Sequence, residues 1–251
     1  MARLSAPPRL GLALLRLFTV QGSWNYERML GVGMGVAQEP LLRPLRDGPD
    51  GAAYRAAVAR AAHFFNAHPY LCGLAAGAAA RAELEGATPE QVERLRMTLG
   101  GPLGSLGDRL VWAGWLPCVS ALAVAGVALG LGWWAAVAFL LVYNAGHVAL
   151  RWWALRAGWA YGTRVAAALH HPVLLRASLL VAPAAALAAG FALPLAASYL
   201  GDLLPPHARP AAVAAAVAGF ALLRLRPDLV SGHRLGLFMV VLALAGALLW
   251  R

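Results

Sequence analysis

From residue 110 onward, the sequence consists mainly of apolar segments that approach the length of a membrane span. The whole chain is 61% hydrophobic and 13% charged, and its mean hydropathy is +0.64. A soluble chain of this length needs polar side chains to cover its outer faces, and the second half has too few of them. The sequence therefore predicts an all-α, polytopic integral membrane protein.

The apolar segments divide the chain into two parts. Residues 1–109 form an N-terminal cytoplasmic or re-entrant part in which apolar stretches are short, and residues 110–251 form a transmembrane helical part. A helix needs about 20 residues to cross the hydrocarbon core of a bilayer. Five segments are candidate spans, of which the fourth is short and the last marginal: 110–131, 133–150, 177–200, 211–223 and 235–250.

Arginine in the connectors predicts the orientation of these spans. Connectors rich in positive charge stay on the cytoplasmic side of a membrane. The connector 151–176 contains no acidic residue, and its arginines are Arg151, Arg156, Arg164 and Arg176. We expect 1–109, 151–176 and 224–234 in the cytoplasm and 201–210 and the C-terminus outside, which gives a multi-pass protein of the plasma (inner) membrane.

The basic charge does not indicate nucleic-acid binding. All 21 basic residues are arginine, and the formal net charge is +10. A nucleic-acid interface needs a basic, polar face with interleaved aromatic residues, whereas most of these arginines lie in short connectors between apolar segments. We expect a lipid bilayer and no nucleic acid among the partners.

The N-terminus has the pattern of an amphipathic helix on the membrane surface. Leu10, Leu14, Leu17 and Phe18 fall on one side, and Arg16 interrupts the apolar run. No small-residue cleavage site follows, so this segment differs from a removed signal peptide.

Two apolar stretches before residue 109 are too short to cross a bilayer. They are residues 29–42 and 71–80, and they are either buried core helices or re-entrant half-helices. The string Gly31, Gly33 and Gly35 lacks the preceding strand of a dinucleotide site, so it indicates close helix packing.

Two more helices are predicted in the N-terminal part. Residues 52–67 place apolar side chains on one stripe, with arginines elsewhere on the surface. Thr88, followed by Pro89 and Gln91, is a capping-box start for a polar helix that runs to about Leu99.

The stretch QGSWNYERM, residues 21–29, places hydrogen-bonding groups beside aromatic rings. Trp24 offers a flat apolar face, and Asn25 and Glu27 offer donors and acceptors, which is the mixture that a sugar pocket uses. The competing interpretation is an aromatic belt at headgroup depth, where Trp and Tyr are enriched.

Two further polar clusters adjoin breaks in apolar segments. In HFFNAHPYL, residues 63–71, Asn66 and His68 precede Pro69, which we expect to stop a helix. In GGPLGSLGDRLVW, residues 100–112, the glycines and Pro102 predict a tight turn with Asp108 at the mouth of the first long span.

Polar residues inside the spans predict a pathway or a packing contact, not a reaction centre. Asn144 and His147 lie on adjacent turns, where polar groups usually face a bundle interior. Cys72 and Cys118 lie in apolar stretches, as buried thiols do. We expect no metal, no cofactor and no catalytic residue, because no nucleophile has a base at the required spacing.

Four of these stretches carry a family resemblance. FTVQGSWNYERM, HFFNAHPYL, GPLGSLGD and YNAGHVALRWWALRAGWAYG resemble, in that order, motifs of the IID membrane subunit of the mannose/fructose/sorbose family of the phosphoenolpyruvate-dependent sugar phosphotransferase system. The matches span about residues 15–165, and the last third agrees in hydrophobic character only.

The resemblance implies a function in sugar transport. A IID subunit pairs with a IIC subunit to carry a hexose across the inner membrane, as a moving core in an elevator, and the pairs associate into a higher hetero-oligomer. Cytoplasmic IIA and IIB proteins carry the phosphoryl histidines, so no histidine of this chain inherits that role. Together with the polar clusters, the resemblance suggests this sugar path or partner contact: Trp24, Asn25, Glu27, Asn66, His68, Asp108 and Asn144.

Departures from the family leave alternatives open. The segment after residue 165 is shortened and rich in alanine, and Arg109 stands where the family has proline or a neutral residue. The chain could therefore be an orphan, IID-like scaffold or regulatory subunit that does not transport. A membrane enzyme acting on lipid or isoprenoid is a third class, and the sequence has no DDxxD or HExxH motif for it.

Overall fold

The computed structural model describes residues 9–47, 51–203, 205–206 and 209–210. Within these residues every named element is a helix, which confirms the all-α prediction. Two units can be distinguished, residues 1–196 and 197–251, and all the packing described below lies in the first. The predicted spans 211–223 and 235–250 and the connector 224–234 lie outside the described residues.

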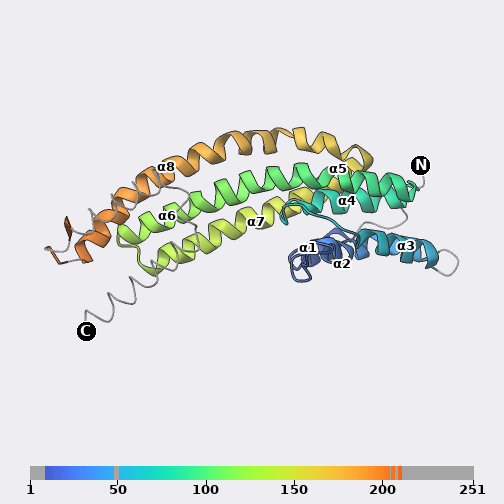
Figure 1. Ribbon diagram of the computed structural model, residues 1–251, viewed down its shortest axis with the longest axis horizontal. Helices are drawn as coiled ribbons and strands as arrows, with labels where there is room; N and C mark the ends of the chain where they lie inside the picture. Colours follow the sequence, from blue (N-terminus) through green and yellow to red (C-terminus); the bar gives the residue numbers. More distant parts are fainter. Residues whose placement is uncertain (1–8, 48–50, 204, 207–208, 211–251) are drawn as a thin grey trace. The chain divides into compact units, whose positions relative to one another are not determined.

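Short helices precede long ones along the chain (Figure 1). The short elements are α1 (Leu10–Leu17), α2 (Gly31–Leu42), the 3-10 helix η1 (Arg43–Asp47), α3 (Ala52–Ala61) and α4 (Cys72–Leu84). The later ones are α5 (Pro89–Gly107), the π-helix η3 (Asp108–Trp115), α6 (Leu116–Ala128), α7 (Trp133–Tyr161), the 3-10 helix η4 (Gly162–His170) and α8 (Pro172–Leu203).

Two helical runs, Pro89–Ala128 and Trp133–Asp202, contain stretches long and apolar enough to cross a membrane. Three predicted spans fall in them: 110–131 in η3 and α6, 133–150 in α7 and 177–200 in α8. Between the runs, Gly130 and Gly132 make a turn with φ of +90° and +54°, values that glycine adopts without strain. Beside α6, α7 lies on one side and α8 on the other (Figure 1).

The helix of the predicted span 133–150 continues into the connector predicted over 151–176. The helix α7 continues to Tyr161, and it ends only where Gly162 takes a φ of +54°. Arginine is a good helix former, so the arginines that mark a cytoplasmic boundary do not stop a helix. Arg151 in particular is buried and bonded within the protein.

The capping box at Thr88 is confirmed. Its hydroxyl accepts a hydrogen bond from the Gln91 backbone N–H at 3.3 Å, and the Gln91 side chain accepts from the Thr88 N–H at 2.9 Å. The helix that starts here does not stop near Leu99, however, but runs through Gly107 into η3.

The helix predicted over 52–67 is α3, and it is shorter than expected because it ends at Ala61. The predicted segments 29–42 and 71–80 form α2 and α4, whose residues are mostly buried. The N-terminal helix α1 buries Ala13 and Leu17 against the protein core and leaves Leu15 exposed.

A single carboxylate joins the first helices. Glu39 of α2 accepts hydrogen bonds from Arg16 of α1 at 2.7 Å, from Arg43 and Arg46 of η1 at 2.9 Å, and from the Tyr54 hydroxyl of α3 at 2.7 Å. The hydrogen bond from Arg43, aided by those from Tyr54 and Arg16, lowers the pKa of Glu39 to about 2, although burial opposes this shift. The carboxylate is therefore charged under all ordinary conditions.

The helices α4 and α7 pack with their backbones almost in contact, at glycines on both. A Cβ atom added to Gly158 of α7 would lie 2.2 Å from the Leu74 carbonyl oxygen, and one added to Gly77 of α4 would lie 2.6 Å from the Leu155 oxygen. No side chain fits at such distances, so only glycine permits this approach.

Replacing Gly158 by alanine should therefore separate α4 from α7. We expect a loss of about 1 to 3 kcal/mol in the free energy of unfolding, typical of an overpacked core. The measurement is denaturant unfolding in detergent, followed by tryptophan fluorescence. The matched control is Gly101→Ala in α5, where an added Cβ meets nothing within 4 Å. Alanine should stabilise that helix by about 0.5 to 1 kcal/mol, and equal stability of the two variants would contradict the packing.

Candidate functional site

Backbone hydrogen bonds join the first two polar motifs. The Leu30 N–H donates to the Phe65 oxygen at 2.9 Å, and the Phe65 N–H donates to the Arg28 oxygen at 3.2 Å. Met29, between the partners on the first loop, has a φ of +52°, which is uncommon for a residue with a side chain. The loop of residues 18–30 is thus held beside that of residues 63–71.

The third motif is not a tight turn, as the sequence predicted, but a helix. Its glycines allow α5 to approach the second motif: a Cβ on Gly107 would lie 2.2 Å from the His68 Cβ, and one on Gly100 would lie 2.9 Å from the Asn66 oxygen. Close packing, and not a special backbone conformation, explains Gly100 and Gly107, since no glycine of this motif has a positive φ.

The three motifs enclose a cavity of about 440 Å³, which we call the motif cavity. Four of the seven predicted site residues line it: Trp24, Asn66, His68 and Asp108. The other polar or aromatic side chains in its wall are Gln21, Ser105 and Trp112. The cavity therefore combines indole faces with amide, carboxylate, hydroxyl and imidazole groups.

His68 presents a hydrogen-bond donor that has no partner among the described residues. Its Nδ1 accepts from the Tyr70 backbone N–H at 3.2 Å, so the proton of the neutral ring is on Nε2. That Nε2 is buried and unbonded, and the side chain is 2% exposed. Burial, helped by the nearby Arg151 and His147, lowers the pKa of His68 to about 4, so the ring is neutral at physiological pH.

An unsatisfied buried donor costs roughly 1 to 3 kcal/mol, and such groups are rare in folded proteins. His68 therefore has an unused hydrogen bond at the wall of the motif cavity.

Three predicted site residues do not line this cavity. Asn25 shapes its own loop, because its Oδ1 accepts from the Arg28 N–H at 2.8 Å and its Nδ2 donates to the Ser23 oxygen at 3.1 Å. Glu27 is exposed, with its carboxylate 4.0 Å from Arg28. Asn144 is exposed on α7 and donates to the Leu140 oxygen at 2.7 Å within the same helix.

Next to His68 lies a cluster formed by Tyr70, Tyr143, His147 and Arg151, of which the sequence indicated only His147 as a polar group facing the bundle interior. The Tyr70 and Tyr143 hydroxyls are 2.7 Å apart, and the His147 ring stacks on Tyr70 with a centroid separation of 3.9 Å. Arg151 donates from Nε to the His147 Nε2 at 2.6 Å, and its Cζ lies 4.8 Å from the Tyr70 ring centre.

The guanidinium of Arg151 is 2% exposed, and no carboxylate pairs with it among the described residues. Its Nη1 donates to the Leu17 carbonyl oxygen at the C-terminus of α1, where a positive charge is favourable. Arg151 therefore connects α7 to the loop that carries Trp24. The sequence signal was present, since His147 and Arg151 are four residues apart on one helical face.

Among the described residues, no group of three His, Cys, Asp or Glu side chains could hold a metal ion. His63 lies 3.3 Å from Glu93 through Nδ1, and it is exposed. The two cysteines in this part of the chain are free and buried, as predicted. Burial raises the pKa of the Cys72 thiol to about 12, which leaves it protonated and unreactive.

The neutral state of His68 predicts how stability depends on pH. The pKa of His68 is lowered from 6.5 to about 4 in the folded protein. The contribution of the neutral ring to the free energy of unfolding is therefore complete above pH 6.5 and is lost as the pH falls toward 4. The full loss is about 3 kcal/mol. Thermal unfolding in detergent between pH 8 and pH 4 measures how steeply stability falls with pH, and this slope should be smaller in His68→Gln.

His170→Gln is the matched control, because His170 is exposed at the end of η4. This variant should keep the wild-type slope, and both variants should keep the loss below pH 4.5 that comes from protonating Glu39. Identical slopes in His68→Gln and the wild type would contradict the assignment.

Comparison with known proteins identifies this arrangement of motifs. The sequence model of the PTS system mannose/fructose/sorbose family IID component matches residues 9–187. The sorbose-specific EIID component of Klebsiella pneumoniae is 32% identical over 60% of this chain and 56% of its own length. The mannose-specific EIID component of Escherichia coli (strain K12) is 28% identical over 59% of this chain and 53% of its own. The chain thus spans about half the length of the curated relatives it matches.

Solved structures share the fold. A chain in the cryoEM structure of the mannose transporter ManYZ with microcin E492 (MceA) has a TM-score of 0.57 at 21% identity, over 95% of this chain and 94% of that one. A chain in a structure described as that of a membrane protein has a TM-score of 0.70 at 21% identity, over 95% of both. The family match covers most of the residues from α1 to α8, so this chain belongs to the mannose/fructose/sorbose family of IID components of the sugar phosphotransferase system.

Proposed function

We propose that this chain is the IID subunit of a phosphoenolpyruvate-dependent sugar phosphotransferase system, and that with a IIC subunit it forms the unit that moves a hexose across the inner membrane. Family membership supports this role, as do relatives named for mannose and sorbose. IIA and IIB proteins supply the phosphoryl group, and the IIC–IID pairs form a higher hetero-oligomer.

The single observation that carries the proposal is the unpartnered Nε2–H of His68 in the wall of the motif cavity. At about 440 Å³, this cavity is within the range of about 300 to 1,000 Å³ typical of small-molecule sites. A hexose has hydroxyl and ring oxygens that can accept the free hydrogen bond, and it has C–H faces that pack on indole rings.

Each lining side chain then has a role. Trp24 and Trp112 contact the C–H faces of the sugar, Asn66 and Asp108 bond its hydroxyls, and His68 donates to an oxygen. Asn25 acts indirectly by shaping the loop that presents Trp24.

The exposed predicted residues suit contact with the second subunit. Glu27 and Asn144 have no partner outside their own segments among the described residues, and both are open to another chain. We assign them to the IIC contact.

The membrane arrangement follows the charges and helix lengths. The chain crosses the membrane several times through its long apolar helices, with residues 1–109 on the cytoplasmic side. The short helices α2 and α4 act as re-entrant half-helices buried in protein, and α1 lies at the interface with Leu15 toward lipid.

The competing function is a scaffold or regulatory subunit that holds a partner but never binds sugar. It is favoured by one observation, that the matched region covers only about half of each curated relative. In that case the motif cavity seals a contact with the partner, and its polar groups are satisfied by the other chain.

Hexose binding by the complex tests the proposal. The chain is co-expressed with a IIC-type subunit, the complex is purified, and binding of radiolabelled mannose, fructose and sorbose is measured. Asn66→Ala and Asp108→Asn should each weaken binding about tenfold or more, because each leaves a sugar hydroxyl without its partner.

His170→Ala is the control for these variants, since His170 is exposed at the end of η4, lies outside the motif cavity and has no proposed role. It should leave sugar affinity unchanged. Co-purification of the IIC subunit shows that each complex is intact. If Asn66→Ala and Asp108→Asn both bind hexose as tightly as the wild type in an intact complex, the assignment of the sugar site is wrong. Absence of hexose binding by the intact wild-type complex would instead support the scaffold function.

A further inference from the structure

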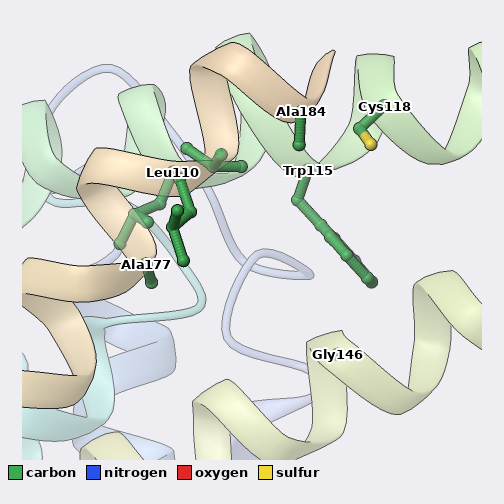
Figure 2. Close-up of a pocket in the computed structure, with 8 residues that line it drawn as sticks. Leu110, Trp115, Cys118, Gly146, Ala177 and Ala184 are labelled. Carbon is green, nitrogen blue, oxygen red and sulfur yellow. The ribbon is translucent and has the colours of Figure 1, made fainter. Parts of the chain in front are cut away.

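A second cavity, of about 350 Å³, lies among the long helices and is almost entirely apolar. We call it the apolar cavity. Leu110 of η3 and Ala177 of α8 lie at one end of it, Ala184 and Cys118 lie toward the other, and the Trp115 side chain extends toward Gly146 of α7 (Figure 2).

Small residues and one large one create this space. Ala177, Val181 and Ala184 lie four and three residues apart, so they form one stripe of α8 that faces the cavity. A Cβ on Gly146 would lie 2.7 Å from the Trp115 Nε1, so the indole reaches the α7 backbone directly. The Trp115 indole fills the space between η3 and α7, whereas Ala177 and Ala184 are too small to fill the space next to it.

The walls of the apolar cavity favour apolar contents, and the one lining polar atom that is buried without a partner among the described residues is the Trp115 Nε1. Water needs several polar partners to be held in a cavity, and the walls offer almost none. Leu180, which lines the cavity, is 67% exposed, and its neighbour Leu179 is 74% exposed. The cavity therefore opens onto the apolar outer surface of α8, which in a membrane protein contacts lipid chains.

Two exposed arginines are adjacent in sequence to the lining residues at one end of the cavity. Arg109 directly precedes Leu110, and Arg176 directly precedes Ala177, the two residues that lie together at that end (Figure 2). Both arginines are exposed; Arg109 donates to the Ser105 carbonyl oxygen at 3.3 Å, and Arg176 forms no ion pair among the described residues. Their charge favours an anionic group at this end of the cavity.

The apolar cavity lies at acyl-chain depth. The stacked, exposed Trp133 and Trp134 begin α7, and aromatic residues of this kind are enriched at membrane interfaces. Gly146, beside the cavity, lies about 20 Å along the helix from Trp133. This is within the hydrocarbon thickness of about 30 Å.

We propose that the apolar cavity binds an acyl chain of an anionic glycerophospholipid, whose phosphate contacts Arg109 and Arg176. Basic groups beside a pocket between membrane helices, on the cytoplasmic side, are the chemistry that recognises such headgroups. This site is separate from the motif cavity, and it does not depend on sugar binding.

Lipid retention by the purified full-length chain tests the headgroup contact. The protein in detergent is mixed with phosphatidylglycerol or phosphatidylcholine of identical acyl chains, and bound lipid is measured by native mass spectrometry. Phosphatidylglycerol should be retained about tenfold more, and the double variant Arg109→Gln/Arg176→Gln should lower it to the level of phosphatidylcholine.

The charge-matched control is Arg28→Gln/Arg94→Gln, which removes two exposed arginines whose neighbours in sequence do not line the cavity. It should retain phosphatidylglycerol as the wild type does. Equal retention of the two lipids by the wild type, or equal loss in both double variants, would overturn the headgroup assignment.

Filling the cavity tests the acyl-chain contact. Ala184→Phe places a ring in the apolar cavity and should reduce retention of both lipids several-fold, whereas Ala186→Phe, on the exposed face of α8, should not. Thermal unfolding of both variants shows whether each is folded. Unchanged retention in a folded Ala184→Phe protein would overturn the proposal.

Cys118 provides an independent reading in the unmodified chain, because it lines the cavity while Cys72 is fully buried. Phosphatidylglycerol should slow alkylation of Cys118 by a maleimide several-fold, and glycerol 3-phosphate should not. Equal protection by glycerol 3-phosphate would mean that a free phosphate, and not a lipid, occupies the site. If phosphatidylglycerol does not protect Cys118, the lipid does not occupy the apolar cavity and the proposal is wrong.

Discussion

The structure depends on the close contact between α4 and α7. Gly77 and Gly158 bring the two backbones together, at distances where a Cβ atom on either glycine would clash with the opposite helix. It holds the start of α4, with Tyr70 just before it, against the part of α7 that carries His147 and Arg151. Because lipid gives helices no hydrophobic reason to associate, close van der Waals packing at small residues has to supply the attraction.

Arg151 links this contact to the motif cavity. It is a buried charge without a carboxylate, so its hydrogen bonds to His147 and to the Leu17 carbonyl oxygen, with the ring of Tyr70, must satisfy it. The same charge lies behind His68 and helps to keep that ring neutral. The wall of the cavity therefore presents a neutral donor to oxygen atoms and does not repel an uncharged ligand.

The proposed sites divide the polar and apolar chemistry of the chain between two cavities. The motif cavity collects polar groups from three motifs, among them Gln21, Asn66, His68 and Asp108, and the lining of the apolar cavity is almost entirely apolar. Arg109, the departure from the family pattern, is adjacent to both, since Asp108 lines the first and Leu110 the second. A single divergent position can in this way affect the lipid contact without entering the sugar path.

Much of the fold could be predicted because its signals are local. Thr88 and Gln91 form a capping box from adjacent residues, and the apolar runs of α6, α7 and α8 are evident from composition. The errors came where distant contacts decide the outcome. The glycines at 100–107 predicted a turn, but they lie in a helix, where Gly100 and Gly107 pack against Asn66 and His68. The arginines after residue 150 did not end α7. Glycine occurs both in turns and at close helix contacts, and arginine occurs both after a helix and within one. Only the residues that lie next to them in space distinguish these cases.

For the candidate site too, some properties follow from the sequence and others only from the tertiary structure. By itself, the sequence determined that the chain is helical and apolar, and that it carries the motifs of the IID family, because these properties follow from residue order and spacing. The tertiary structure alone decided that Trp24, Asn66, His68 and Asp108 share one cavity while Asn25, Glu27 and Asn144 do not. It also decided that His68 has an unused donor. Cavities and unsatisfied hydrogen bonds depend on which distant segments meet, and that is settled by backbone contacts at glycine that sequence spacing does not encode.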